Sequence, residues 1–140
     1  MADAIVIGSG PNGLAAAIVI AQTGRTVIVF EAEPTIGGGA RSGELTLPGF
    51  VHDLCSAIHP FGVASPFFRS LPLAQFGLEW IEPPVMLAHP LDDGPAGAIY
   101  RDLDRTAQGL DGDANAYRRV IGQVAEDWPR IASAVAFGSL

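Results

Sequence analysis

Six residues near the N-terminus, Gly8-Ser9-Gly10-Pro11-Asn12-Gly13, have the spacing G-x-G-x-x-G. The glycines suit phosphate binding, because each permits backbone geometry that a side chain would prevent. Gly8 allows a sharp turn, Gly10 lets a pyrophosphate approach the backbone, and Gly13 lets a helix pack closely on strands. A helix that starts here would present free N–H groups and its positive dipole end to phosphates. We therefore assign Gly8, Gly10, Pro11, Asn12 and Gly13 to nucleotide binding.

The local context strengthens this assignment, since glycine is common in the chain, with 17 in 140 residues. Residues 4–7 form a short apolar β-branched run, which predicts a buried strand before the glycines. Residues 14–23 predict a helix that Gly24 stops, and residues 26–30 predict a second buried strand. Strand, turn, helix and strand make a βαβ unit of about 30 residues with parallel strands. The predicted fold class is therefore α/β, with a Rossmann-like dinucleotide-binding unit.

An acidic residue, Glu31, ends the second predicted strand, and Ala32 follows it. A carboxylate at this position can accept hydrogen bonds from a ribose diol. A solvated carboxylate at a strand end and a purely structural glycine turn are the simpler alternatives. The combination of the glycine turn and the acid favours nucleotide binding, with Glu31 and Ala32 beside the adenosine ribose.

A second glycine-rich loop, Gly37-Gly38-Gly39-Ala40-Arg41-Ser42, follows the acid within a few residues. Its backbone can bring more N–H groups to a pyrophosphate, and we assign Gly38 and Gly39 to this role. Arg41 adds a cation whose fork geometry suits phosphate oxygens. A plain NAD-binding unit does not need this second loop, so the sequence favours FAD as the cofactor.

Residues 4–31, followed by GGGARS, resemble the FAD unit of the flavoprotein family that includes phytoene desaturases, carotenoid isomerases and amine oxidases. The stretch LPGFVHDLCSAIHPF, residues 47–61, resembles the phytoene dehydrogenase-related branch. Where family members often have glycines after the Asp, this chain has Leu54, Cys55 and Ser56. The resemblance implies an FAD-dependent oxidoreductase that dehydrogenates a small apolar substrate. Three alternatives remain open: a flavin-dependent isomerase, a non-enzymatic remnant with weak nucleotide binding, and an NAD-binding domain without flavin.

No side chain is assigned to catalysis, because the flavin of such enzymes carries the hydride chemistry itself. The three histidines, His52, His59 and His89, are not spaced as a metal site, so no metal is predicted. His59 falls near the flavin ring according to the resemblance, and Cys55 is interpreted as a small buried hydrophobe. An aromatic group is interpreted as core first and as the lining of a substrate cavity second: Phe61, Phe67, Phe68, Phe76 and Trp80.

The rest of the chain predicts smaller elements. We expect a hairpin with arms at 44–47 and 50–52, a helix capped by Asp53, and strands at 78–81, 85–89 and 98–100. Asp102 and Asp113 are expected to cap two helices, the second breaking at Pro129. Domain 1–65 is the FAD-binding unit, and 66–140 begins an α+β substrate-side region. Two parallel strands and one helix make an incomplete dinucleotide fold, with one sheet face bare.

The overall charge of the chain limits its partners. The formal net charge is -7 and the eight basic residues are all arginine, so nucleic acid binding is not expected. The apolar N-terminal stretch has no basic segment before it and is interrupted by the glycine turn, so no transmembrane segment is predicted. The single cysteine favours a reducing compartment, the cytoplasm. The oligomeric state is left open.

Overall fold

The computed structural model describes residues 1–136 and 138. The chain divides into two compact units, Met1–Pro60 and Phe61–Leu140. The first unit contains both glycine-rich loops, and the second contains the aromatic group.

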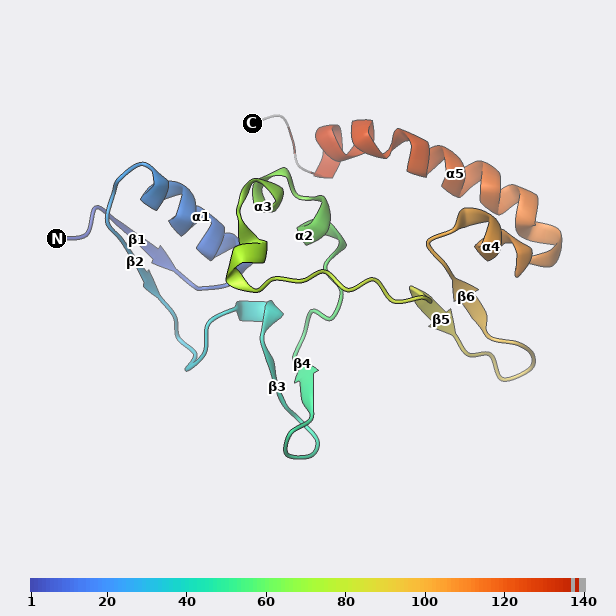
Figure 1. Cartoon of the computed structure of the whole chain (residues 1–140), viewed down its shortest axis with the longest axis horizontal. Helices are drawn as coiled ribbons and strands as arrows, with labels where there is room; N and C mark the ends of the chain where they lie inside the picture. The colour runs from blue at the N-terminus through green and yellow to red at the C-terminus, as the bar shows by residue number, and fades with distance from the viewer. Residues whose placement is uncertain (137, 139–140) are drawn as a thin grey trace. The chain divides into compact units, whose positions relative to one another are not determined.

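The first unit begins with the predicted βαβ arrangement (Figure 1). Strand β1 (Ala4–Ile7) is followed by helix α1 (Pro11–Gln22) and strand β2 (Val27–Phe30). The strands pair in parallel, with Ala4 opposite Val27 and Ile7 opposite Phe30. Gly24, with a φ of 82°, turns the chain after the helix, as expected from its position. The α/β prediction is confirmed for this part of the chain.

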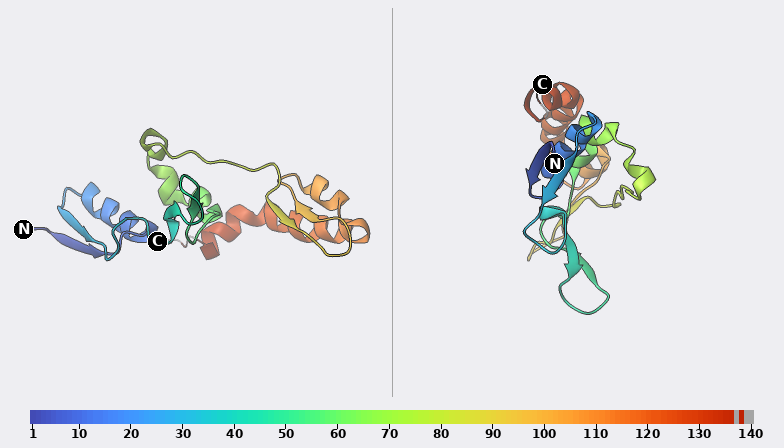
Figure 2. Two further views of the ribbon diagram at one scale, coloured as in Figure 1. Left: turned by 90° about the horizontal axis from the view of Figure 1, so that it is seen from below. Right: turned by 90° about the vertical axis from the view of Figure 1, so that its left-hand side faces the viewer.

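The two faces of this small sheet differ in burial. Helix α1 contacts both strands and covers one face of their sheet (Figure 2). Val6 and Val29 are half-buried. The opposite face is open among the described residues, with Ile7 87% and Phe30 56% exposed. The apolar runs predicted buried strands, but the sequence also predicted that this incomplete fold leaves one sheet face bare, and that face is exposed here. The bare face is the one that two strands and one helix must leave uncovered.

After β2 the chain forms a 3-10 turn (Gly38–Ala40) and a hairpin of strands β3 (Ser42–Glu44) and β4 (Val51–Asp53). The predicted hairpin exists, but its ladder lies further from the Pro-Gly turn than expected. Asp53 was expected to cap a helix. Instead it ends β4, and its carboxylate accepts a hydrogen bond of 2.9 Å from the Ser42 hydroxyl. The helix prediction is wrong because this cross-strand bond uses the Asp53 side chain.

The first part of the second unit is made of short helices. Helix α2 (Pro60–Ala64), which starts at the division between the units, is followed by α3 (Pro66–Ser70) and a 3-10 turn at Leu73–Phe76. Ser65 caps α3 by accepting a hydrogen bond from the Phe68 N–H. The strand predicted at 78–81 is wrong, because no neighbouring segment of the described chain pairs with it.

The later part of the second unit follows its sequence more closely. Strands β5 (Leu87–His89) and β6 (Gly97–Ile99) pair in antiparallel fashion around the turn containing Gly94, whose φ is 133°. Helix α4 (Leu103–Gln108) is capped by Asp102, which accepts from the Arg105 N–H at 2.8 Å. Both features are as predicted.

Helix α5 (Ala114–Ile131) passes through Pro129 and continues as a π-helical turn at Ala132–Ala136. The predicted break at Pro129 is therefore wrong. A proline removes one backbone hydrogen bond, but Pro129 lies near the end of α5 and the helical conformation continues past it to Ile131. Apolar side chains of α5 are also open in this unit, with Val120 55% and Val124 47% exposed.

No helix in the described part of the chain is long and apolar enough to cross a membrane.

The packing of α1 on the turn before it generates a stability prediction. A Cβ added at Gly13 would overlap the Gly8 carbonyl oxygen, which is a fixed backbone atom. Alanine in a helix gains up to about 1 kcal/mol over glycine, but overpacking costs about 1–3 kcal/mol. We expect Gly13→Ala to lower the free energy of unfolding by up to about 2 kcal/mol, measured by urea denaturation.

The matched control is Gly112→Ala, where an added Cβ meets no atom within 4 Å. Its unfolding free energy should stay within about 0.5 kcal/mol of the parent protein. Equal stability of the two variants would show that the turn and α1 are not packed as described.

Candidate nucleotide-binding site

The glycine turn joins β1 to α1 in the geometry that the sequence predicts. Gly8 has a φ of 92°, a conformation that favours glycine, and its N–H donates to the Phe30 carbonyl at 2.7 Å. Gly10 is the N-cap of α1, and Pro11 occupies the first turn, where its missing N–H costs nothing. The turn therefore continues the strand pairing and then opens directly into the helix.

The two glycine-rich loops, far apart in the sequence, lie against each other. The Gly37 N–H donates to the Ser9 carbonyl at 3.0 Å. A Cβ on Gly38 would lie 2.9 Å from the Gly10 Cα, and a Cβ on Gly10 would lie 3.8 Å from the Gly38 Cα. Gly38 also has a φ of 55°. The loops can approach this closely because Gly38 carries no side chain, whereas a Cβ on Gly10 would make only an ordinary contact.

Both loops carry backbone donors that the protein itself does not use. The N–H groups of Gly10, Asn12 and Gly13 donate no hydrogen bond within the described part of the chain. The same holds there for the N–H groups of Gly38 and Gly39. Free donors at a helix N-terminus and in an adjoining glycine loop are the groups that hold a phosphate. These residues therefore fit a pyrophosphate.

Glu31, directly after β2, is drawn to the glycine turn by hydrogen bonds. Its Oε2 accepts from the Ser9 N–H at 2.8 Å and from the Ser9 hydroxyl at 2.5 Å. Its Oε1 accepts from the Glu33 N–H at 3.0 Å. These bonds, the one from the Ser9 hydroxyl foremost, lower the pKa of Glu31 to about 2. The carboxylate is therefore ionised at neutral pH and can only accept further hydrogen bonds.

Arg41 lies in the second loop but already has partners. Its Nε donates to the Gly38 carbonyl at 3.0 Å, and its guanidinium pairs with Glu33 at 3.3 Å. The Arg41 side chain is 25% exposed and that of Glu33 is 57% exposed. The sequence predicts a phosphate contact for Arg41, and its local pattern gives no signal that Glu33 is the partner of this cation.

The other residues that the sequence analysis singled out near these loops are exposed to solvent. Pro11, Asn12 and Ala32 are exposed. Cys55 is exposed rather than buried, and a Cβ on Gly39 would lie 3.8 Å from its Sγ. His59 is exposed, and its Nδ1 lies 3.5 Å from the Ser56 hydroxyl. The described residues contain no group of three or more side chains that could hold a metal ion.

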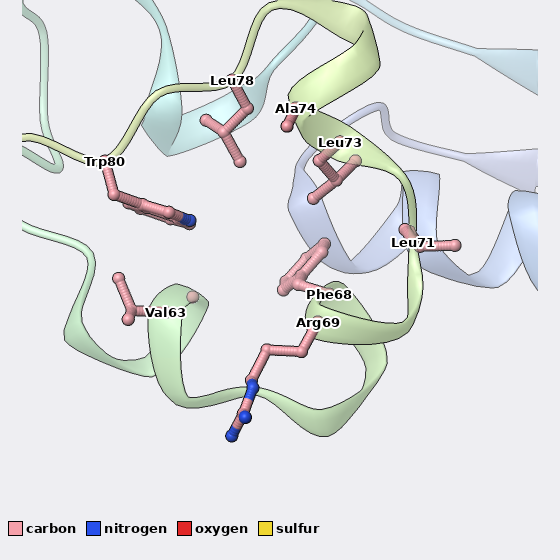
Figure 3. A pocket seen from close by; sticks show the side chains of 9 residues that line it. Val63, Phe68, Arg69, Leu71, Leu73, Ala74, Leu78 and Trp80 are labelled. Carbon is pink, nitrogen blue, oxygen red and sulfur yellow. The ribbon is translucent and has the colours of Figure 1, made fainter.

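The second unit contains a small apolar cavity of about 190 Å³. Figure 3 shows Phe68, Leu78 and Trp80 among its lining, with their side chains directed toward one another. Two members of the predicted aromatic group thus line a cavity. Two others, Phe61 and Phe76, are 61% and 82% exposed.

A sequence model of the family described as NAD(P)-binding Rossmann-like domain matches residues 6–71 of the chain. This range includes both glycine loops and Glu31. The chain therefore contains a Rossmann-like NAD(P)-binding domain within a mixed helix-and-strand fold.

Three curated relatives show what the chain is similar to. One of the subunits of limonene dehydrogenase from Castellaniella defragrans is 29% identical over 77% of this chain and 19% of its own length. Dihydrolipoyl dehydrogenase of Manduca sexta is 54% identical over 26% of this chain and 7% of its own length. Thiamine thiazole synthase of Methanococcus maripaludis is 41% identical over 35% of this chain and 19% of its own length.

Two of these three relatives are named as dehydrogenases. The chain spans no more than 19% of the length of any of the three.

The Arg41–Glu33 pair generates a prediction on anion affinity. Glu33 pairs with the Arg41 guanidinium and adds negative charge beside the loops, so it would compete with a phosphate that reached Arg41. An exposed ion pair is worth about 0.2–1 kcal/mol. We expect Glu33→Gln to tighten ADP binding about two- to fivefold at low salt, with a smaller gain at high salt, measured by isothermal titration.

The control is Glu126→Gln on α5, which makes the same change in net charge in the other unit. Its ADP affinity should match that of the parent protein. Weaker ADP binding by Glu33→Gln would mean that Glu33 contacts the nucleotide itself.

Proposed function

We propose that the first unit binds the ADP half of FAD, and that the protein is an FAD-dependent oxidoreductase. The observation that carries this proposal is the approach of Gly10 to Gly38, with unused backbone donors on both loops. A second glycine loop beside the first adds donors that a plain NAD-binding turn lacks. The ionised Glu31, at the end of β2, is suited to accept from the adenosine ribose.

Each group in this arrangement would have a separate task. The N–H groups of the two loops would hold the pyrophosphate, and Arg41 would add a charge-assisted contact. Glu31 and Ala32 would lie beside the ribose. When bound, the flavin supplies the hydride chemistry, and the protein supplies binding and orientation. This division explains why we assign no catalytic side chain in the chain.

We further propose an apolar substrate and kinship with phytoene dehydrogenase-related enzymes. The stretch at 47–61 supports the kinship through its sequence. The apolar cavity that Phe68 and Trp80 line supports an apolar substrate, although its size of about 190 Å³ suits only part of a larger molecule. The name of the limonene dehydrogenase relative refers to a hydrocarbon, which agrees with an apolar substrate. A cytoplasmic location remains our proposal from the single cysteine.

A second candidate function is the binding of a nicotinamide dinucleotide without flavin. The description of the matching family as NAD(P)-binding favours it, since FAD and NAD share the ADP half. The two candidates differ in the visible spectrum. Purified protein with absorbance bands between about 350 and 500 nm, and free FAD released on denaturation, would support flavin binding. A colourless protein that binds NADH but not FAD would overturn it.

The Gly10 backbone generates a prediction that separates binding from folding. A Cβ at this position makes only ordinary contact with protein, so the space beyond it is open to a ligand. We expect Gly10→Val to reduce bound FAD to less than about a tenth of the parent content, because the side chain would occupy the pyrophosphate position. The midpoint of thermal unfolding, measured without ligand, should change little.

The control is Gly97→Val in β6, where an added Cβ meets no atom within 4 Å. This variant should retain its flavin. Flavin retained by Gly10→Val, or lost only together with the fold, would contradict the assignment of Gly10 to the cofactor.

A further inference from the structure

The polar residue Ser9 is one of the most buried in the described chain, with 1% of its surface exposed. Its N–H and its hydroxyl both donate to the same oxygen of Glu31, at 2.8 Å and 2.5 Å. Its carbonyl accepts from the Gly37 N–H at 3.0 Å. Ser9 therefore joins the end of β2, the first glycine turn and the second glycine loop.

The glycine pattern itself does not require a hydroxyl at this position. In G-x-G-x-x-G the second residue is unrestricted, and the backbone of Ser9 already makes one bond to Glu31 Oε2 and one with Gly37. The hydroxyl adds a second donor to an oxygen that already has one. The hydroxyl therefore acts on the Glu31 carboxylate, which accepts its bond.

The hydrogen bonds divide the two oxygens of Glu31 unequally. Oε2 accepts two bonds from Ser9 and Oε1 accepts one from the N–H of Glu33, and a weaker backbone contribution comes from Ala32. A carboxylate has about four acceptor sites, so Oε1 keeps capacity for an incoming donor. The two bonds from Ser9 to Oε2, together with the Glu33 N–H bond to Oε1, restrict rotation of the carboxylate about its terminal torsion, which is otherwise broad.

We propose that Ser9 is a positioning residue for ribose recognition: its hydroxyl fixes Oε2 of Glu31, so that Oε1 is held ready to accept from the ribose diol. This inference rests on the proposed nucleotide function and extends it to a residue that the glycine pattern leaves open. Without the hydroxyl, the carboxylate keeps the Ser9 N–H bond to Oε2 and the Glu33 N–H bond to Oε1, and Oε2 is held less firmly. Nucleotide binding must then also order the carboxylate, which weakens the affinity.

The test compares ADP with 2′,3′-dideoxy-ADP, which has the same phosphates and base but no ribose diol. The ratio of their dissociation constants measures recognition of the diol alone. We expect the parent protein to prefer ADP, and Ser9→Ala to bind ADP about tenfold more weakly with dideoxy-ADP binding unchanged. A merely structural role would weaken both ligands equally and leave the ratio unchanged.

The pH dependence of the same ratio provides a second readout, in which titration of the phosphates cancels. In the parent protein the pKa of Glu31 is about 2, so the ratio should stay constant as pH falls from 7 to 4. Loss of the hydroxyl raises this pKa toward its ordinary value, because the largest cause of its lowering is gone. In Ser9→Ala the remaining preference for ADP should therefore fall further below about pH 5.

Two additional variants keep the test decisive. Ser70→Ala removes a hydroxyl that bonds the Phe67 carbonyl in the second unit, and it should change neither ligand's affinity. If Ser9→Ala does not fold, Ser9→Cys, with a similar size and a weaker donor, should show the same reduced ratio. A parent protein that binds no ADP would overturn the proposed function and this inference together. A parent preference for ADP that Ser9→Ala or Ser9→Cys retains in full would overturn the role of Ser9 alone.

Discussion

The close approach of two backbone segments, around Gly10 and around Gly38, is the constraint on which the rest of the site depends. A Cβ on Gly38 would lie 2.9 Å from the Gly10 Cα, so the segments meet only where the side chain is absent. The bond from the Gly37 N–H to the Ser9 carbonyl holds the second loop at this distance. Arg41 takes its position from the second loop, whereas Glu31 takes its position from the end of β2 and from its bonds to Ser9 in the first loop.

The electrostatics of this region follow from the same geometry. The chain has a net charge of -7, and the loops lie beside two carboxylates, Glu31 and Glu33. Arg41 is the cation in contact with Glu33, which already neutralises part of its charge. An anion bound here must therefore rely mainly on backbone N–H groups and the dipole of α1. Such donors are fixed by the fold, which favours a ligand of defined shape over anions in general.

The apolar surfaces outside the site follow from how few elements each unit contains. Helix α1 covers one face of the β1–β2 sheet, and Ile7 and Phe30 remain exposed on the other. Continuous apolar runs along parallel strands are typical of sheets covered on both faces. The sequence therefore has the pattern of a sheet that is covered on both faces. In the first unit, α1 covers only one of these faces.

The sequence by itself determined the elements whose signals are local. The β-branched runs, the glycine spacing and Gly24 predicted the βαβ unit, because strand propensity, turn conformation and helix termination depend on neighbouring residues. Asp102 predicted its helix for the same reason. Only the tertiary structure decided the pairing of Ser9 with Glu31, of Arg41 with Glu33 and of Gly10 with Gly38, and the lack of a pairing partner for residues 78–81 within the described chain. These features join residues that are separated in the chain, and a strand or an ion pair forms only where the fold brings its partner within bonding distance.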